Sequence, residues 1–346
     1  MNTRLVLIPL TRPWGPEVTD IRVIEVVVVD DTGARGHGFS WTPTIGGSAV
    51  QALIDADLGP FARGRPAEPS WWNAAWEHLH EAGGAGVTTI ALAGLDLALW
   101  DLVAQRAGRG LAETLGRRHP SLPTYGSGVN LHYSLDELVA QANRWVEAGY
   151  SGVKVKVGKP DLAEDIDRLR AVREIIGPRR DLMVDANQRW DLDRAVQAVS
   201  AFEPFEIAWL EEPLRAEDLA GHRELKRRTG VRIAVGENIH TLSRFEEYLD
   251  AGAADVLQPN IIRVGGITPA LGIARRVQQA GAELAFHLLP ELSAQVAFAG
   301  EKPTRIEIVE DARFEELGAL TGPSGLVVLH GTVSGGPGVG LGLQFR

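Results

Sequence analysis

The alternation of short apolar runs with helical stretches after Leu122 constrains the fold more than any other feature of this sequence. Eight runs have strand-like composition: Leu122–Tyr125, Gly152–Val157, Asp181–Asp185, Ile207–Glu211, Val231–Glu237, Asp255–Pro259, Ala282–His287 and Arg305–Ile308. The segments between them have helical composition, as in Ser134–Ala148 and Asp161–Ile176. Repeated strand–helix units are typical of a parallel sheet, and eight units in about 200 residues fit a closed (β/α)8 barrel. A doubly wound open sheet fits the same alternation and is the alternative.

The first third of the chain has strands before helices. Three candidate strands come first: Thr3–Leu10, Ile21–Asp30 and Arg35–Ser40. The clearest helical segment runs from Thr88 to Arg106. This order predicts an α+β domain over residues 1–120, followed by a barrel domain over residues 121–325. The glycine-rich end, residues 326–346, is expected to contain one short strand and to fold back on the first domain.

The composition of the 346 residues excludes several functions. The chain has no cysteine, which rules out disulfides, thiolate metal sites and a cysteine nucleophile. Its net charge of −10 argues against a nucleic-acid-binding face. The longest early apolar run, Leu5–Leu10, is too short to cross a bilayer, so we expect a soluble cytoplasmic protein with no membrane partner. P-loop, HExxH, G-x-S-x-G and dinucleotide-binding motifs are absent from the sequence, so nucleotide-dependent and serine-hydrolase chemistry lack support.

Three of the apolar runs end in a carboxylate. Asp185, Glu211 and Glu237 are 26 residues apart, one strand–helix unit each. Because the carboxyl ends of barrel strands meet at one mouth, we expect these side chains to converge there. Converging carboxylates repel one another unless a cation lies among them, and oxygen-only ligation favours Mg²⁺ over zinc. The sequence therefore predicts a magnesium site, against the simpler interpretation of solvated acids on a barrel rim.

Two of the five lysines lie two residues apart in one strand-like run. Lys154 and Lys156 would share one face of the strand, with valines on the other. Since helices cover the outside of a barrel, we expect both lysines to face the interior near the mouth. Burial and mutual repulsion are expected to lower their pKa, which makes a base usable near neutral pH. The alternative is a pair of solvated lysines on an exposed strand.

Two further candidates come from the last runs. His287 ends the seventh run, on the barrel side roughly opposite the lysine strand, and Glu307 lies near the end of the eighth. A single histidine is often only a packed or surface residue, so its position leaves its role open.

Taken together, the motifs resemble the enolase superfamily, mandelate racemase subgroup. They are Lys-Val-Lys156, Asp185-Ala-Asn187, Trp-Leu-Glu211-Glu-Pro213, Gly-Glu237-Asn238, Arg-Val-Gly-Gly-Ile-Thr268 and His287. The resemblance covers nearly the whole chain, since Leu95–Asp101 is similar to the family's last capping-domain helix and Pro337–Leu341 to its C-terminal return. It implies a capping α+β domain over a modified (β/α)7β barrel, whose eighth unit lacks a regular helix.

The resemblance also implies roles for individual residues. The implied reaction removes the proton α to a substrate carboxylate and gives an enediolate. Lys156 is similar to the family's base, and Lys154 to a neighbour that tunes it and touches the carboxylate. Asn187 is implied as a contact to the α-hydroxyl, and Glu307 as an acid that hydrogen-bonds the carboxylate or enediolate. The implied ligands of Mg²⁺ are Asp185, Glu211 and Glu237.

One position departs from the subgroup's usual pattern. Where the sixth strand usually ends in an aspartate paired with the histidine, this chain has Asn260. An asparagine oxygen can orient the ring of His287 through Nδ1–H but adds no negative charge, which predicts a poorer base and a readier acid. We therefore expect dehydration of a sugar acid or related hydroxy acid, with Lys156 removing the α-proton and His287 assisting departure of the β-hydroxyl. A racemase or epimerase is the first alternative, and a non-catalytic binding protein on the same fold is the second.

The resemblance further implies that substrate choice depends on two capping-domain loops, here residues 12–17 and 41–47. Arg12, Trp14 and Trp41 in these loops suit a polar or an aromatic group equally well, so they leave the acid undetermined. We expect the partner to be a small-molecule carboxylate and the protein to be a homo-oligomer.

Overall fold

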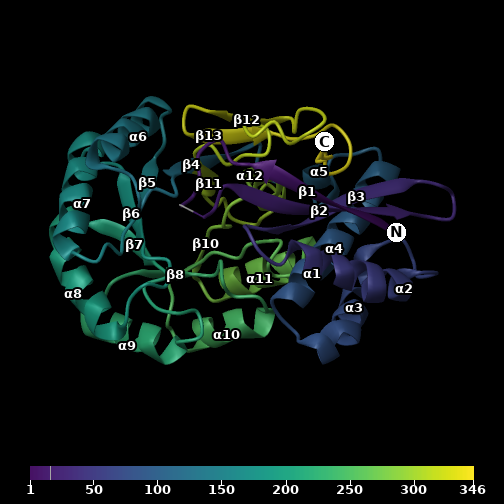
Figure 1. The fold of residues 1–346 in the computed structure, drawn as a ribbon, viewed down its shortest axis with the longest axis horizontal. Helices are drawn as coiled ribbons and strands as arrows, with labels where there is room; N and C mark the ends of the chain where they lie inside the picture. The colour runs from purple at the N-terminus through teal and green to yellow at the C-terminus, as the bar shows by residue number, and fades with distance from the viewer. Residues whose placement is uncertain (16) are drawn as a thin grey trace.

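The computed structural model describes residues 1–15 and 17–346. It consists of a capping layer of three strands and several helices beside a barrel with helices on its outside (Figure 1). The cap contains an antiparallel meander in the order β1-β2-β3. Its elements are β1 (Asn2–Pro9), β2 (Asp20–Val29), β3 (Arg35–Thr42), α1 (Gly47–Leu53), α2 (Gly59–Ala62), α3 (Trp72–Leu79), α4 (Val87–Arg106) and α5 (Leu111–Thr114).

Eight parallel strands form the barrel. They are β4 (Ser121–Ser127), β5 (Gly152–Lys156), β6 (Asp181–Asp185), β7 (Ile207–Glu211), β8 (Ile233–Val235), β9 (Val256–Leu257), β10 (Glu283–Leu284) and β11 (Ile306–Val309). Each strand from β4 to β10 pairs with the next, and β11 pairs with β4 on its other side. The hydroxyl of Thr304 donates to the carbonyl of Leu284 and links the β11 end to β10. The expected barrel is therefore confirmed, and the open doubly wound sheet is excluded.

Seven helices follow the first seven barrel strands. They are α6 (Leu135–Glu147), α7 (Leu162–Ile176), α8 (Leu192–Phe202), α9 (Leu219–Thr229), α10 (Leu242–Asp250), α11 (Ile267–Gln279) and α12 (Pro290–Ala297). Polar side chains fix several of their starts, as where Ser134 and Glu137 form a reciprocal capping box on α6. After β11 the described residues 310–325 form turns and no helix, which gives the (β/α)7β pattern.

Three barrel strands are shorter than the sequence predicts. The apolar runs that end at Glu237, Pro259 and His287 form ladders over only two or three residues, in β8, β9 and β10. The chain leaves the ladder at Gly236, whose backbone packs against the main chain of Gln258. Glu237 and His287 consequently lie in loops just beyond their strands.

The C-terminal segment contains two strands, so the expectation of a single short strand is wrong. β12 (Leu326–Leu329) and β13 (Thr332–Gly335) form a hairpin, and β13 pairs antiparallel with β4 of the barrel. A two-residue turn is enough to return the chain. The last residues then reach the cap, where Leu341 N–H donates to Asp101 over 2.6 Å and the ring of Phe345 lies 5.2 Å from that of Phe39.

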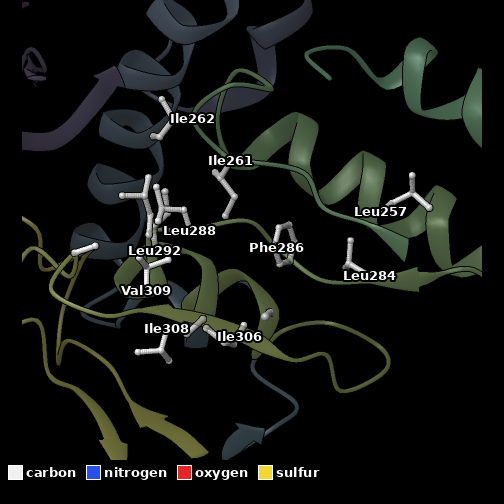
Figure 2. Close-up of a cluster of buried hydrophobic side chains, with 14 of the residues drawn as sticks. Leu257, Ile261, Ile262, Leu284, Phe286, Leu288, Leu292, Ile306, Ile308 and Val309 are labelled. Carbon is white, nitrogen blue, oxygen red and sulfur yellow. The ribbon is translucent and has the colours of Figure 1, made fainter. Parts of the chain in front are cut away.

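Cap and barrel share one apolar core. The largest buried cluster joins cap residues such as Phe39 and Leu97 to side chains from every barrel strand. Figure 2 shows the part of it that lies around β9, β10 and β11, and there Ile262 lies close to a helix of the cap. Helix α4 is long and apolar enough to cross a membrane, but 78% of its apolar window is buried inside the protein. Because it is covered on nearly all sides, α4 acts as the core helix between the two domains.

Close approach of α4 to β3 depends on glycine. A Cβ added to Gly38 would lie 2.3 Å from the Gly94 carbonyl oxygen and 2.4 Å from the Ala98 nitrogen. These are backbone atoms, so neither neighbour can rotate away as a side chain would.

We predict that Gly38→Ala lowers the free energy of unfolding by at least about 2 kcal/mol, because the added methyl forces the helix away from the sheet. Chemical denaturation followed by circular dichroism measures the loss. Gly322→Ala is the control, since a Cβ at Gly322 meets nothing within 4 Å. Equal stability of the two variants would contradict this packing.

Candidate metal centre and active site

Three carboxylates meet at the carboxyl ends of the barrel strands. The registers of β5, β6 and β7 place Lys156 beside Asp185 and Asp185 beside Glu211. Glu237 reaches the same place from the loop after β8. One oxygen from each of the three acids lies within 4.8 Å of the other two, and all three residues are buried. Oxygen donors at this spacing suit a hard divalent cation.

The charge around this cluster also favours a cation. Five buried carboxylates face only two buried lysines, Lys154 and Lys156. The five are Asp185, Glu211, Glu212, Glu237 and Glu307. Burial raises the pKa of Glu211 to about 7, and burial with the nearby Glu237 carboxylate raises the pKa of Glu212 well above its usual range. A divalent ion would relieve most of this excess negative charge.

Both lysines lie inside the barrel. Lys154, with a side chain 1% exposed, places Nζ 2.7 Å and 2.9 Å from the two oxygens of Glu211 and 2.7 Å from Oε1 of Glu307. The ammonium of Lys156 pairs with Asp185. The expectation that their pKa values are lowered is wrong. Burial lowers the pKa of each lysine, but the surrounding carboxylates outweigh it, so the pKa of both is raised.

Glu307 connects Lys154 to the loop that follows His287. Its Oε1 accepts from Lys154, and its Oε2 accepts from the backbone N–H of Leu288 over 2.9 Å. Burial opposes ionisation, but the Lys154 ammonium dominates and brings the pKa of Glu307 to about 2. Glu307 is therefore an anion that orients Lys154 and the loop after His287.

Asn260 determines which ring nitrogen of His287 carries the proton. The Asn260 oxygen accepts from the backbone N–H groups of Ile262 and Arg263, at 3.0 Å and 3.1 Å. Its NH₂ group therefore faces Nδ1 of His287, 3.1 Å away. Since an amide N–H donates, Nδ1 accepts and the ring proton lies on Nε2. The expectation that the Asn260 oxygen receives Nδ1–H is wrong, because backbone groups already occupy that oxygen.

The protonated nitrogen of His287 points into the carboxylate cluster. Nε2 lies 2.8 Å from Oε2 of Glu237, which accepts a hydrogen bond from Nε2–H. In this arrangement the site-facing nitrogen of His287 is a hydrogen-bond donor and has no lone pair free to act as a base.

A layer of amide side chains supports the cluster. Gln258 donates to Glu211 over 2.7 Å, and Asn238 donates to both oxygens of Glu212 and to Glu237. Asn187 donates its backbone N–H to Asp185 over 2.8 Å. Sequence reasoning did not select Glu212, Asn238 or Gln258 as site residues. Glu212 directly follows Glu211, Asn238 directly follows Glu237, and Gln258 lies two residues before Asn260. This closeness to selected residues was the available signal.

Unusual backbone conformations surround the site. Five residues one or two positions after a site residue have positive φ: Asn187 (43°), Gln188 (61°), Glu212 (39°), Leu288 (57°) and Leu289 (51°). Left-handed backbone conformations cost energy for residues with side chains. They persist where surrounding contacts fix the chain, as they often do at functional sites. The loops after β6, β7 and β10 are thus held in shapes that aim the functional side chains.

The predicted capping-loop residues contact barrel elements and one another. Arg12 pairs with Glu137 of α6 over 2.6 Å and stacks 3.5 Å from the centre of the Tyr133 ring. Trp14 lies against Trp41, with ring centres 6.3 Å apart. Trp41 also lines a cavity of about 250 Å³, together with Ile45, Asn238, His240 and Arg263. The predicted loop of residues 12–17 includes residue 16, which lies outside the described residues.

Comparison with known proteins identifies the family of this chain. Residues 6–116 match the mandelate racemase/muconate lactonizing enzyme N-terminal domain, and residues 137–346 match the family described as enolase C-terminal domain-like. A 3,6-anhydro-alpha-L-galactonate cycloisomerase of Streptomyces coelicolor is 38% identical over 299 residues, which are 85% of this chain and 83% of the relative.

Two solved structures share the whole architecture. A racemase from Streptomyces coelicolor with bound magnesium has a TM-score of 0.92 and 34% identity, over 99% of this chain and 96% of that chain. An L-talarate dehydratase from Polaromonas, complexed with Mg and L-glucarate, has a TM-score of 0.85 and 35% identity, over 99% and 93% of the two chains. This protein therefore belongs to the enolase superfamily, in its mandelate racemase/muconate lactonizing enzyme group.

Proposed function

We propose that this protein is a Mg²⁺-dependent enzyme that removes the proton α to the carboxylate of a small hydroxy acid, and that it dehydrates a sugar acid or related acid. The observation that carries the proposal is the buried cluster of three carboxylates within 4.8 Å, with a lysine paired to one of them. The similarity to a sugar-acid cycloisomerase and to an L-talarate dehydratase supports the same reaction class.

The donor set of this chain fits magnesium. Asp185, Glu211 and Glu237 would hold the ion, because they are all-oxygen ligands in a region of excess negative charge. When bound, Mg²⁺ supplies positive charge beside the substrate carboxylate and stabilises the negative charge that develops on proton removal. The Lys154 ammonium, held in place by the Glu307 carboxylate, orients the substrate carboxylate in this proposal.

Lys156 is the proposed base, because it extends from β5 into the cluster beside the ligand Asp185. Despite burial, the Asp185 charge raises the pKa of Lys156, and Mg²⁺ bound to Asp185 would cancel that charge and allow the amine to take a proton. His287 lies across the cluster, at Glu237. Its Nε2–H would hydrogen-bond the departing β-hydroxyl, and loss of that hydroxide together with the α-proton amounts to dehydration. Asn187, half-buried beside Asp185, is the proposed contact to the α-hydroxyl.

Arg12, Trp14 and Trp41 are proposed to contact the distal part of the substrate from the capping loops. A domain boundary near residue 120, a homo-oligomeric state and a cytoplasmic location are predictions that follow from the sequence and from the metabolic class of the relatives.

A racemase or epimerase is the second candidate, because a racemase with bound magnesium shares the fold. Two-sided proton exchange requires a base on each face of the substrate carbon. The Nε2–H form of His287, imposed by Asn260, supplies a donor on its side and thus favours dehydration. A protein that binds acids without turnover is the third candidate.

Incubation with a panel of sugar acids in D₂O, with Mg²⁺, separates the three functions. Dehydration gives a keto acid, which semicarbazide detects. Exchange or inversion of the α-proton without loss of water would indicate a racemase. Absence of both exchange and product across a broad panel would contradict the proposed reaction and leave the binding protein.

For the metal site, we predict that Glu211→Gln weakens Mg²⁺ binding at least about tenfold, because it removes one of three ligand charges. Isothermal titration calorimetry measures the affinity. Glu224→Gln is the control, since Glu224 pairs with Arg227 on the surface. Unchanged affinity in Glu211→Gln would show that the ion binds elsewhere.

For the base, Lys156→Met is expected to reduce turnover by at least about a hundredfold, the lower range for removal of a positioned general base. Lys159→Met is the matched control three residues along the chain, where the lysine is partly exposed beside Glu164. Both variants are assayed at saturating Mg²⁺. Normal turnover without Lys156 would mean that another group takes the proton.

For the histidine, we predict that Asn260→Asp adds exchange of the opposite epimer's α-proton. One carboxylate oxygen would keep the two backbone hydrogen bonds, and the other would accept Nδ1–H and free Nε2 to act as a base. Deuterium incorporation into each epimer is followed by NMR for parent and variant. If the parent already exchanges both epimers at comparable rates, Asn260 does not disable His287.

A further inference from the structure

A short segment after β9 connects the functional asparagine to the cap. Residues 260–268 run from Asn260 to the first turn of α11, and three cap side chains contact their far end. Trp72 donates from Nε1 to the Gly265 carbonyl over 2.8 Å. Trp100 donates from Nε1 to the hydroxyl of Thr268 over 2.9 Å.

Asp96 of α4 makes the most specific of these contacts. Its Oδ2 accepts from the backbone N–H of Thr268 over 2.9 Å, and its Oδ1 accepts from the Thr268 hydroxyl over 2.6 Å. Asp96 is only 2% exposed, and it has no ion-pair partner among the described residues. Burial raises its pKa to about 7. A carboxylate without a cation partner in a domain core is costly, so its place at the start of α11 calls for an explanation.

The segment is shaped to receive the cap side chains. Gly265 and Gly266 have φ of 101° and 113°, a region that favours glycine. A Cβ at Gly265 would lie 2.7 Å from Cζ2 of Trp72, and one at Gly266 would lie 2.3 Å from Oδ2 of Asp96. The two glycines therefore leave the space that Trp72 and Asp96 fill.

The same segment orients the asparagine. The N–H of Gly266 donates to the carbonyl of Ile261 over 2.8 Å, and that of Val264 donates to the carbonyl of Asn260 over 3.0 Å. The side-chain oxygen of Asn260 accepts from Ile262 and Arg263 within this turn. A displaced turn would release the amide whose NH₂ group faces His287.

We propose that Asp96 is a positioning residue, which holds the turn of residues 260–268 so that Asn260 keeps the ring of His287 in its Nε2–H form. The role in turnover rests on the function proposed above. The contact chain from Asp96 to His287 does not depend on it, and a spectroscopic measurement without substrate tests that chain.

The test compares Asp96→Asn with Asp101→Asn. Asp101 lies on the same helix, is similarly buried at 3% exposure, and likewise accepts backbone N–H groups, from His37 and Leu341. Those partners belong to the cap and the C-terminal tail, so Asp101 controls for loss of a buried carboxylate on α4. In Asp96→Asn only one oxygen remains to accept, so the hydrogen bond from the Thr268 hydroxyl is lost or reversed and the hold on the turn is weakened.

The readout is the ¹⁵N NMR spectrum of histidine-labelled protein with Mg²⁺ and no substrate, with the His287 signals assigned by a His287→Gln variant. The parent and Asp101→Asn are expected to show one tautomer, with Nδ1 unprotonated. Asp96→Asn is expected to lose this single form and show averaged nitrogen shifts. A parent-like spectrum in Asp96→Asn, or an equal change in Asp101→Asn, would overturn the proposal.

Thr268→Val and Thr268→Ser provide a second route if Asp96→Asn does not fold. Valine keeps the shape and the backbone N–H but removes the hydroxyl that donates to Asp96, so Thr268→Val should change the ¹⁵N chemical shifts of His287. Serine keeps a hydroxyl, so Thr268→Ser should keep the parent values. A parent-like spectrum in Thr268→Val would count against the proposal. With an active substrate, Asp96→Asn should lower kcat about tenfold and change KM less than about twofold. A tautomer change without any turnover in the parent would retain the positioning role and reject only the reaction.

Discussion

Repulsion among buried carboxylates at the barrel mouth is the constraint to which the rest of this structure responds. Five carboxylates lie out of water with two lysines among them, and removal of one partner from such a group typically costs about 3–5 kcal/mol. Lys154 is held by two of these acids at once, which keeps it in place as a fixed positive charge. A divalent ion completes the balance, so metal binding and the integrity of the mouth are physically linked.

A second constraint makes the two sides of the site chemically different. The cluster has a lysine on one side and His287 on the other, but the two differ in what they can do. Lys156 is a buried lysine paired with a ligand carboxylate. The ring of His287 is held between an amide donor and the carboxylate of Glu237, which leaves its site-facing nitrogen protonated. A site with one base and one opposing donor suits elimination better than inversion.

The sequence predicted what depends on periodicity and on strand ends. The apolar runs marked the position of every barrel strand. Their last residues identified the three acids, because the carboxyl ends of barrel strands lie together at one mouth. The direction of the Lys156 pKa shift could not be inferred in this way, since it depends on how many carboxylates surround the ammonium in space. Nor could the orientation of the Asn260 amide, which depends on two backbone N–H groups of the following turn. The short ladders of β8 to β10 likewise reflect packing of loops at the mouth.

The most direct test of the account is the position of the bound ion. Crystals of the protein soaked with Mn²⁺, a substitute for Mg²⁺ that scatters anomalously, would locate it. We predict one strong anomalous peak in contact with carboxylate oxygens of Asp185, Glu211 and Glu237, with Lys156 adjacent. A peak at any other cluster, or none at saturating Mn²⁺, would contradict the claim that these three acids form the metal centre.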